Sequence, residues 1–127
     1  MNFEKVVFGF FITLAAALNA GFIIGDMSNP LLHNVYELAA AVVASLIATV
    51  LKFGDRTQLG AVHLSTSLVA DLQLIAAAVI WTWASQVSVT GVTASSMSTV
   101  VSMAFGAFLA NIVSVVLMVG EILGNHR

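Results

Sequence analysis

Three side chains that can bind a cation or carry a proton recur every four residues along one stretch of the sequence. They are His63, Ser67 and Asp71, and at this spacing they share one face of a helix. Asp71 lies midway along an apolar stretch that is long enough to cross a membrane. An ionised carboxylate there costs several kcal/mol unless something pairs with it, so a small protein seldom keeps one for packing alone. We therefore expect Asp71 to be the central group of a cation- or proton-binding site.

The same spacing argues against catalysis and against a metal site. A catalytic triad needs the histidine between the nucleophile and the acid, but here Ser67 is in the middle. His63 and Asp71 are two helical turns apart, about 12 Å, so they cannot ligate one metal ion. The chain has no cysteine, no Gly-rich phosphate loop and no His-Glu-x-x-His motif. We expect no enzymatic activity, no metal and no cofactor.

A second polar stripe consists of Glu37, Ala41, Ser45 and Thr49, again four residues apart. Such a stripe is typical of a helix that lines a water-filled path, and a ring of Glu37 carboxylates at its outer mouth would favour cations. Ser45, Thr49, Ser67 and His63 are then the path-lining candidates. A second interpretation of Glu37 is open, because Asn34 followed by Glu37 also fits a capping box at a helix start.

Three polar residues have structural alternatives as well. Asp71 is either an ion site or a hydrogen-bonded carboxyl that locks two helices together. His63 is either a pH-sensitive gate or an interfacial side chain. Asn19 falls at a depth similar to that of Asp71 and could help to bind a cation there, or it could hydrogen-bond to a neighbouring helix, as Asn111 could.

The elements that must position these residues are membrane helices. The 127 residues are 60% hydrophobic and 8% charged, with a mean hydropathy of +1.05, whereas soluble domains carry about 25% charged residues. Four apolar segments predict spans at about 6–24, 35–51, 58–85 and 97–122. Backbone groups in lipid must bond within their own segment, so the spans are α-helices. We predict an all-α membrane protein with a single four-helix domain over residues 1–127.

The first of these spans resembles a secretory signal peptide, because an apolar run follows Lys5. Glu4 interrupts the basic region that such a peptide needs. We therefore interpret the segment as a membrane helix.

The basic residues predict the orientation of the four spans. Lys5, Lys52, Arg56 and Arg127 all fall on one side of the membrane, which should be the cytoplasm. Both termini are then cytoplasmic. The aromatic residues near the opposite ends of the spans agree with this orientation, since Trp and Tyr favour the membrane interface; they are Tyr36, Trp81 and Trp83.

Small residues four apart recur in the spans and predict close helix packing. The longest stripe comprises Ala94, Ser98, Ser102, Gly106, Ala110 and Ser114. Four helices offer more of this surface than one compact bundle needs, so we expect a homo-oligomer. The net charge of −2 argues against a nucleic-acid partner.

Two short segments resemble a family of small, uncharacterised bacterial inner-membrane proteins. These segments are Asn34-Val35-Tyr36-Glu37-Leu38 and Lys52-Phe53-Gly54-Asp55-Arg56-Thr57-Gln58. The resemblance implies a four-helix integral protein of the bacterial inner membrane. It implies no activity and no site residues.

The leading hypothesis from the sequence is a homo-oligomeric channel or transporter for K⁺, Na⁺ or H⁺. Asp71, Glu37 and Asn19 would be its cation- or proton-binding residues. The alternative hypothesis is an accessory or scaffolding subunit of a larger membrane-protein complex, in which Asp71 bonds to a partner helix.

Overall fold

The computed structural model describes residues 3–25, 29, 33–54 and 57–125. The described chain forms α1 (Phe3–Ile23), α2 (Val35–Lys52), α3 (Gln58–Thr82) and α4 (Ala94–Asn125), and a π-helical turn, η2 (Trp83–Val87), continues α3. All four α-helices are long and apolar enough to cross a membrane. The chain is therefore an all-helical protein with four candidate membrane spans.

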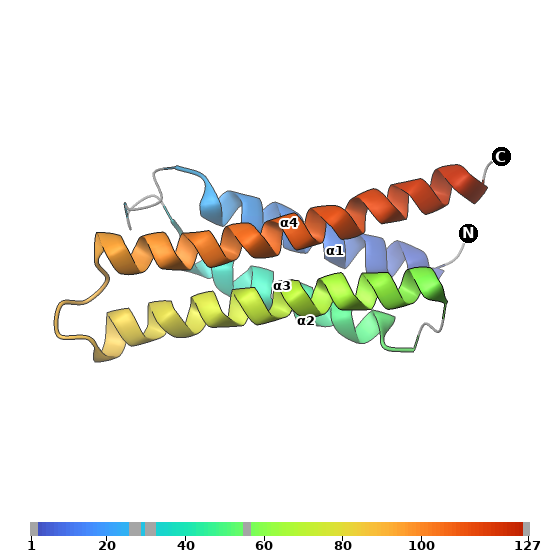
Figure 1. Cartoon of the computed structure of the whole chain (residues 1–127). Helices are drawn as coiled ribbons and strands as arrows, with labels where there is room; N and C mark the ends of the chain where they lie inside the picture. The colour runs from blue at the N-terminus through green and yellow to red at the C-terminus, as the bar shows by residue number, and fades with distance from the viewer. Residues whose placement is uncertain (1–2, 26–28, 30–32, 55–56, 126–127) are drawn as a thin grey trace.

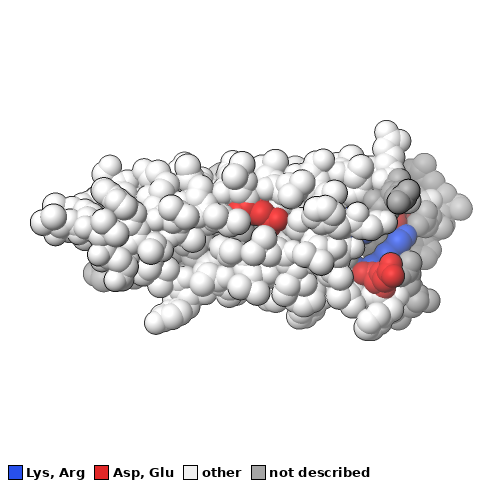
Figure 2. Space-filling view, turned by 90° about the horizontal axis from the view of Figure 1, so that it is seen from below, with Lys and Arg blue, Asp and Glu red and all other residues white. Residues whose placement is uncertain are grey.

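The helices form one antiparallel bundle in which each helix packs beside the next and α1 closes the ring against α4 (Figure 1). The start of α1 and the end of α4 lie at the same end of the bundle, together with the turn between α2 and α3. Charged side chains gather at that end, whereas the rest of the face in Figure 2 is uncharged apart from a small acidic area about midway along it.

Side-chain caps explain where α2 and α4 begin. The Asn34 side chain accepts a hydrogen bond from the backbone N–H of Tyr36. Thr93 and Ser96 cap each other, since the Oγ of each accepts from the other's backbone N–H. Because of this reciprocal cap, α4 begins at Ala94 rather than at the predicted Met97. The apolar pattern alone could not indicate the earlier start, because the first turn of the helix is polar.

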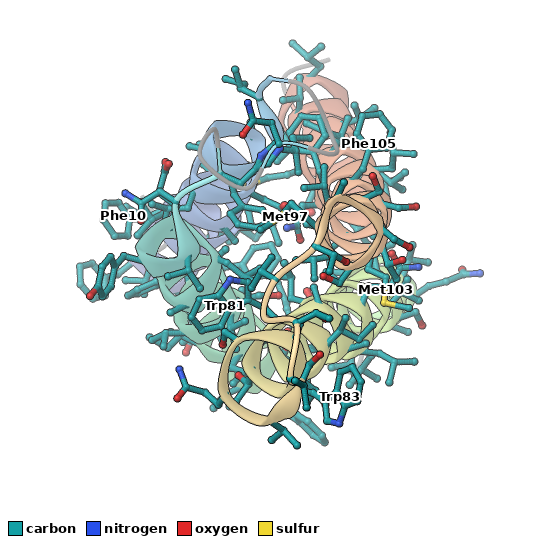
Figure 3. All side chains as sticks on the ribbon, turned by 90° about the vertical axis from the view of Figure 1, so that its left-hand side faces the viewer. Phe10, Trp81, Trp83, Met97, Met103 and Phe105 are labelled. Carbon is teal, nitrogen blue, oxygen red and sulfur yellow. The ribbon has the colours of Figure 1, made fainter. Side chains whose placement is uncertain are left out.

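The core follows a spacing of three and four residues on every helix. On α3, for example, His63, Ser67, Ala70, Leu74 and Ala77 are buried. This spacing is that of left-handed antiparallel bundles. Figure 3 looks along the bundle from the end opposite the start of α1 and shows Met97 inside, with Phe10, Trp83 and Phe105 on the outside.

Glycine permits two close contacts between polar side chains and neighbouring helices. The amide of Gln73 on α3 lies against Gly106 of α4, and the carboxylate of Glu37 on α2 lies against Gly21 of α1. A Cβ at either glycine would overlap the polar group. Part of the predicted small-residue surface is thus used inside the bundle, as close packing of membrane helices requires.

Substitution of Gly106 by Ala is therefore expected to destabilise the bundle relative to Gly120→Ala. A methyl group at Gly120 meets nothing within 4 Å, so that control receives only the higher helix propensity of Ala, up to about 1 kcal/mol. In Gly106→Ala the new methyl group must displace the Gln73 amide, and the cost of this displacement should cancel the stability gained from helix propensity. The measurement is thermal unfolding in mild detergent. The difference should vanish in a Gln73→Ala background, and its persistence there would exclude the Gln73 contact as its cause.

Candidate functional site

Asp71 lies inside the bundle, with 6% of its surface exposed, and it faces α2. Its Oδ1 accepts a hydrogen bond from Ser45 Oγ at 2.6 Å, and its Oδ2 accepts one from Thr49 Oγ1 at 2.5 Å. Both carboxylate oxygens are thus bonded to hydroxyl groups of the adjacent helix. The structure brings together three residues that the sequence placed on two separate stripes.

Local helix geometry orients the two hydroxyl groups. Ser45 and Thr49 are four residues apart, so they occupy one face of α2. Thr49 Oγ1 also lies 2.9 Å from the backbone oxygen of Ser45, which is the usual bond of a hydroxyl inside a membrane helix. Both residues are buried. The pair forms a fixed polar surface against which Asp71 packs.

His63 lies two turns from Asp71 along α3, towards the charged end of the bundle. The structure places it inside the bundle rather than on the surface, with 2% of its area exposed. Its Nδ1 is 2.6 Å from Ser114 Oγ of α4, and its ring contacts the ring of Phe8 edge to face, with centroids 5.1 Å apart. Lys52 Nζ stands 4.3 Å from the centroid of the same Phe8 ring.

Ser67 and Asn111 occupy the space between Asp71 and His63. The bond from His63 to Ser114 and the contact of Gln73 with Gly106 set the register of α3 against α4. Ser67 and Asn111 therefore lie at similar heights along the bundle. Both side chains are fully buried, and within the described chain Ser67 Oγ and both amide atoms of Asn111 have no hydrogen-bond partner.

Asn19 is a third side chain of this kind, since it is fully buried and its two amide atoms have no partner in the described chain. The ion pair between Lys5 and Glu121 sets the register of α1 against α4. Asn19 is as far along α1 from Lys5 as Ala107 is along α4 from Glu121, so Asn19 and Ala107 lie at similar heights. The register of α3 against α4 given above places Asp71 near the height of Ala107 as well, and Asn19 therefore lies at a height along the bundle similar to that of Asp71. More than nine in ten buried polar groups in proteins are bonded, and the exceptions often bind water or an ion.

These residues divide the apolar core in two. One apolar cluster lies at the end of the bundle formed by Phe22, Leu38 and Met97. The other consists of Phe8, Ile12 and Ala48 with their neighbours. Between the two clusters lies a polar band, by which we mean Ser45, Thr49, His63, Ser67, Asp71, Asn111 and Ser114.

The structure does not bring Glu37 into the polar band. Glu37 is two turns from Ser45, about 12 Å along α2, and its carboxylate lies against Gly21 of α1. It is partly exposed. Its backbone N–H donates to the backbone oxygen of Asn34 at 3.0 Å, within the first turn that Asn34 caps. Any role of Glu37 is therefore separate from the contacts of Asp71.

An apolar groove continues from the site along the seam between α2 and α3. Its volume is about 480 Å³, and its lining residues are Val42, Ile75, Ala78, Val79, Thr82, Trp83 and Val87. It begins one turn beyond Asp71, on the side away from His63. In the described part of the chain, no three His, Asp or Glu side chains gather closely enough to hold a metal ion.

Ser114 is the site residue that the sequence did not single out. It was part of the small-residue stripe, and only its three-residue spacing from Asn111 marked it as a member of a polar core face. A single sequence cannot show which helix such a face meets, so the bond to His63 was not predictable.

Comparison with protein families gives one match, over residues 32–122, to the family of unknown function DUF6394. The chain belongs to DUF6394. The match agrees with the resemblance to an uncharacterised family. Neither the curated proteins nor the solved structures that were compared gave a match. The family assignment names no activity, so function must be inferred from the site.

Thr49→Val is expected to destabilise the protein by about 1 kcal/mol, because it leaves a buried carboxylate oxygen without its donor. Thr66→Val is the matched control, since Thr66 Oγ1 bonds to the backbone oxygen of His63 in its own helix at 3.0 Å. Unfolding by denaturing detergent would measure both. If the two variants lose equal stability, the contact of Thr49 with Asp71 contributes nothing between helices.

Proposed function

We propose that this protein binds a small cation inside the membrane and moves it across, with Asp71 as the binding group. The observation that supports this most strongly is a carboxylate buried at the middle of a spanning helix beside side chains that have unfilled hydrogen-bonding capacity. Ionisable residues inside membrane segments usually mark ion pathways or proton relays. A positive ion at Asp71 would compensate the charge that lipid penalises.

The other candidate residues have different roles in this proposal, which depend on their distance from Asp71. Ser45 and Thr49 orient the carboxylate, because each donates a hydroxyl group to one of its oxygens. Ser67 and His63 line the path towards the charged end of the bundle. Asn19 supplies amide atoms at the height of Asp71. Glu37 attracts cations at the opposite end, away from the binding site. The cation is K⁺, Na⁺ or H⁺.

We also propose that the protein is a multi-pass protein of the bacterial inner membrane with both termini in the cytoplasm. The positive-inside rule supports this orientation, since Lys5 and Lys52 lie at the end of the bundle where α1 begins and α4 ends. A homo-oligomer remains part of the proposal, supported by small residues that α1 exposes, such as Thr13 and Ala17. Because Asp71 faces α2 of its own chain, each chain would carry its own path.

One observation favours a second candidate function, that of an accessory subunit. Both oxygens of Asp71 are already bonded to α2, as expected of a carboxyl group that locks two helices. In that case the apolar outer faces of the four helices would contact partner proteins as well as lipid. The side chains of Ser67, Asn19 and Asn111, which have no hydrogen-bond partner among the residues that the structure describes, favour the cation-binding proposal, because a carboxyl group that only joins two helices does not require them.

Asp71→Asn is expected to abolish cation flux in liposomes that contain the purified protein, because it removes the charge and keeps the shape of the side chain. Leu72→Ala is the control at the same depth; Leu72 is 71% exposed and should be dispensable. Flux of K⁺, Na⁺ and H⁺ would be followed with ion-sensitive dyes. Unchanged flux in Asp71→Asn would remove Asp71 from the mechanism, and no flux of any cation through the unsubstituted protein would overturn the transport proposal.

The orientation can be tested with single cysteines, since the chain has none of its own. Val89 is fully exposed between α3 and α4, and Gly54 is exposed in the turn after α2. In intact spheroplasts, a membrane-impermeant maleimide is expected to label Val89→Cys. Gly54→Cys should react only after the membrane is opened. The reverse pattern would invert the proposed orientation.

A further inference from the structure

The hydrogen bonds of Thr49 can accommodate an additional proton at Asp71. A hydroxyl group has a single hydrogen to donate, yet Thr49 Oγ1 lies 2.5 Å from Asp71 Oδ2 and 2.9 Å from the backbone oxygen of Ser45. When Asp71 is ionised, Thr49 donates to Oδ2. When Oδ2 carries a proton, that proton is donated to Thr49, whose own hydrogen turns to the oxygen of Ser45. The site holds either state by rotating one hydroxyl group.

A metal cation fits the same site less well. Hard metal cations bind several oxygen atoms at once, whereas both oxygens of Asp71 already accept hydrogen bonds. No other carboxylate of the described chain joins them, as Glu37 lies two turns away on α2. The arrangement can therefore gain or lose a proton without moving its heavy atoms, whereas a metal ion would need these oxygens and further ligands to rearrange around it.

From this geometry we infer that the transported cation is a proton and that it passes along the polar band between Asp71 and His63. The inference rests on the proposed function and names its substrate. The two groups are about 12 Å apart along α3, whereas proton transfer needs a hydrogen bond of about 2.6–3.2 Å or one water between the groups. Water molecules must bridge the interval.

Ser67 and Asn111 are placed to bind those water molecules. They lie between the two ends of the relay, they are fully buried, and their three polar atoms have no partner within the described chain. A buried water molecule needs two to four polar partners, and these atoms offer bonding capacity from two facing helices. The bridge is thus supported by side chains whose polar groups otherwise have no partner.

The transfer balances as a chain of O–H and N–H bonds. The O–H group of protonated Asp71 turns from Thr49 to the first of the water molecules held by Ser67 and Asn111, and its O–H bond breaks towards that water. Each water passes one of its own protons to the next, and the last gives one to a ring nitrogen of His63. The products are ionised Asp71 and protonated His63. His63 then releases a proton at the charged end, and Asp71 takes up another. Among the described residues, the charged groups on the elements packed around His63 are Asp71 on its own helix, Lys52 of α2 beyond the Phe8 ring, Glu4 and Lys5 near the start of α1, and Glu121 near the end of α4.

The experiment is proton flux in liposomes driven by a potassium diffusion potential, with Na⁺ flux measured in parallel. The unsubstituted protein should carry protons and no Na⁺. Ser67→Ala should lower proton flux about tenfold, and His63→Gln about a hundredfold, because each interrupts a positioned proton-transfer group. Ser65→Ala is the matched control: Ser65 is exposed and its Oγ bonds to the backbone oxygen of Ala61, so its flux should not change. Asn111→Ala tests the bridge from the other helix and should also lower flux.

The outcomes separate the relay from the transport proposal. Na⁺ flux without proton flux would overturn the relay and leave cation transport at Asp71 intact. Proton flux that Ser67→Ala and Asn111→Ala leave unchanged, in variants that unfold at the same temperature as the unsubstituted protein, would overturn the route. No flux of either ion, together with no K⁺ flux in the dye assay described above, would overturn both.

Discussion

The contact of Asp71 with Ser45 and Thr49 constrains the whole bundle. A carboxylate at this depth must be paired, and the pairing groups here come from a different helix. Because both oxygens are bonded, α2 cannot rotate or slide against α3 without exposing them to an apolar environment. The contact therefore fixes the relative rotation of two helices, and with it the direction in which Ser67 and His63 face. The position of the polar band follows from this one pairing.

The polar band weakens the core that contains it. It separates one apolar cluster from the other, and its polar atoms that have no partner within the described chain cost desolvation free energy with no hydrogen bond in return. The rest of the bundle compensates through close approach, with Ala at many core positions and a polar side chain seated on each of two glycines. The two ends of the bundle are thus tightly packed, whereas several polar groups in the middle lack hydrogen bonds within the described chain. This difference is expected if the middle serves transport rather than stability.

The sequence was sufficient for the four helices and for the position of Asp71 midway along the third of them, because both depend on runs of apolar residues along one segment. It also placed Ser45 and Thr49 on one face. It grouped Glu37 with them, although residues four apart turn by about 40° on a helix, so Glu37 is rotated by about 80° from Ser45 and meets α1 instead. Which faces meet depends on the rotation of whole helices, and that is why the bonds from Asp71 to α2 and from His63 to Ser114 could not be predicted.

The two halves of the bundle differ in a way that bears on how a proton would cross. From Asp71 towards the end where α1 begins, the interior first carries hydroxyl, amide and imidazole groups and then the smaller apolar cluster of Phe8, Ile12 and Ala48. From Asp71 towards the other end, the core is an apolar cluster, with Asn19 near its inner edge, and the adjacent seam between α2 and α3 is an apolar groove. A continuous column of water cannot form along such a surface. In the proposed transport, Asp71 would therefore stand between a half that offers polar groups to water and a half that has to open, and a separation of α2 from α3 would have to break the bonds of Asp71 to Ser45 and Thr49. This asymmetry suits a transporter that binds and releases its cation in separate steps better than an open channel.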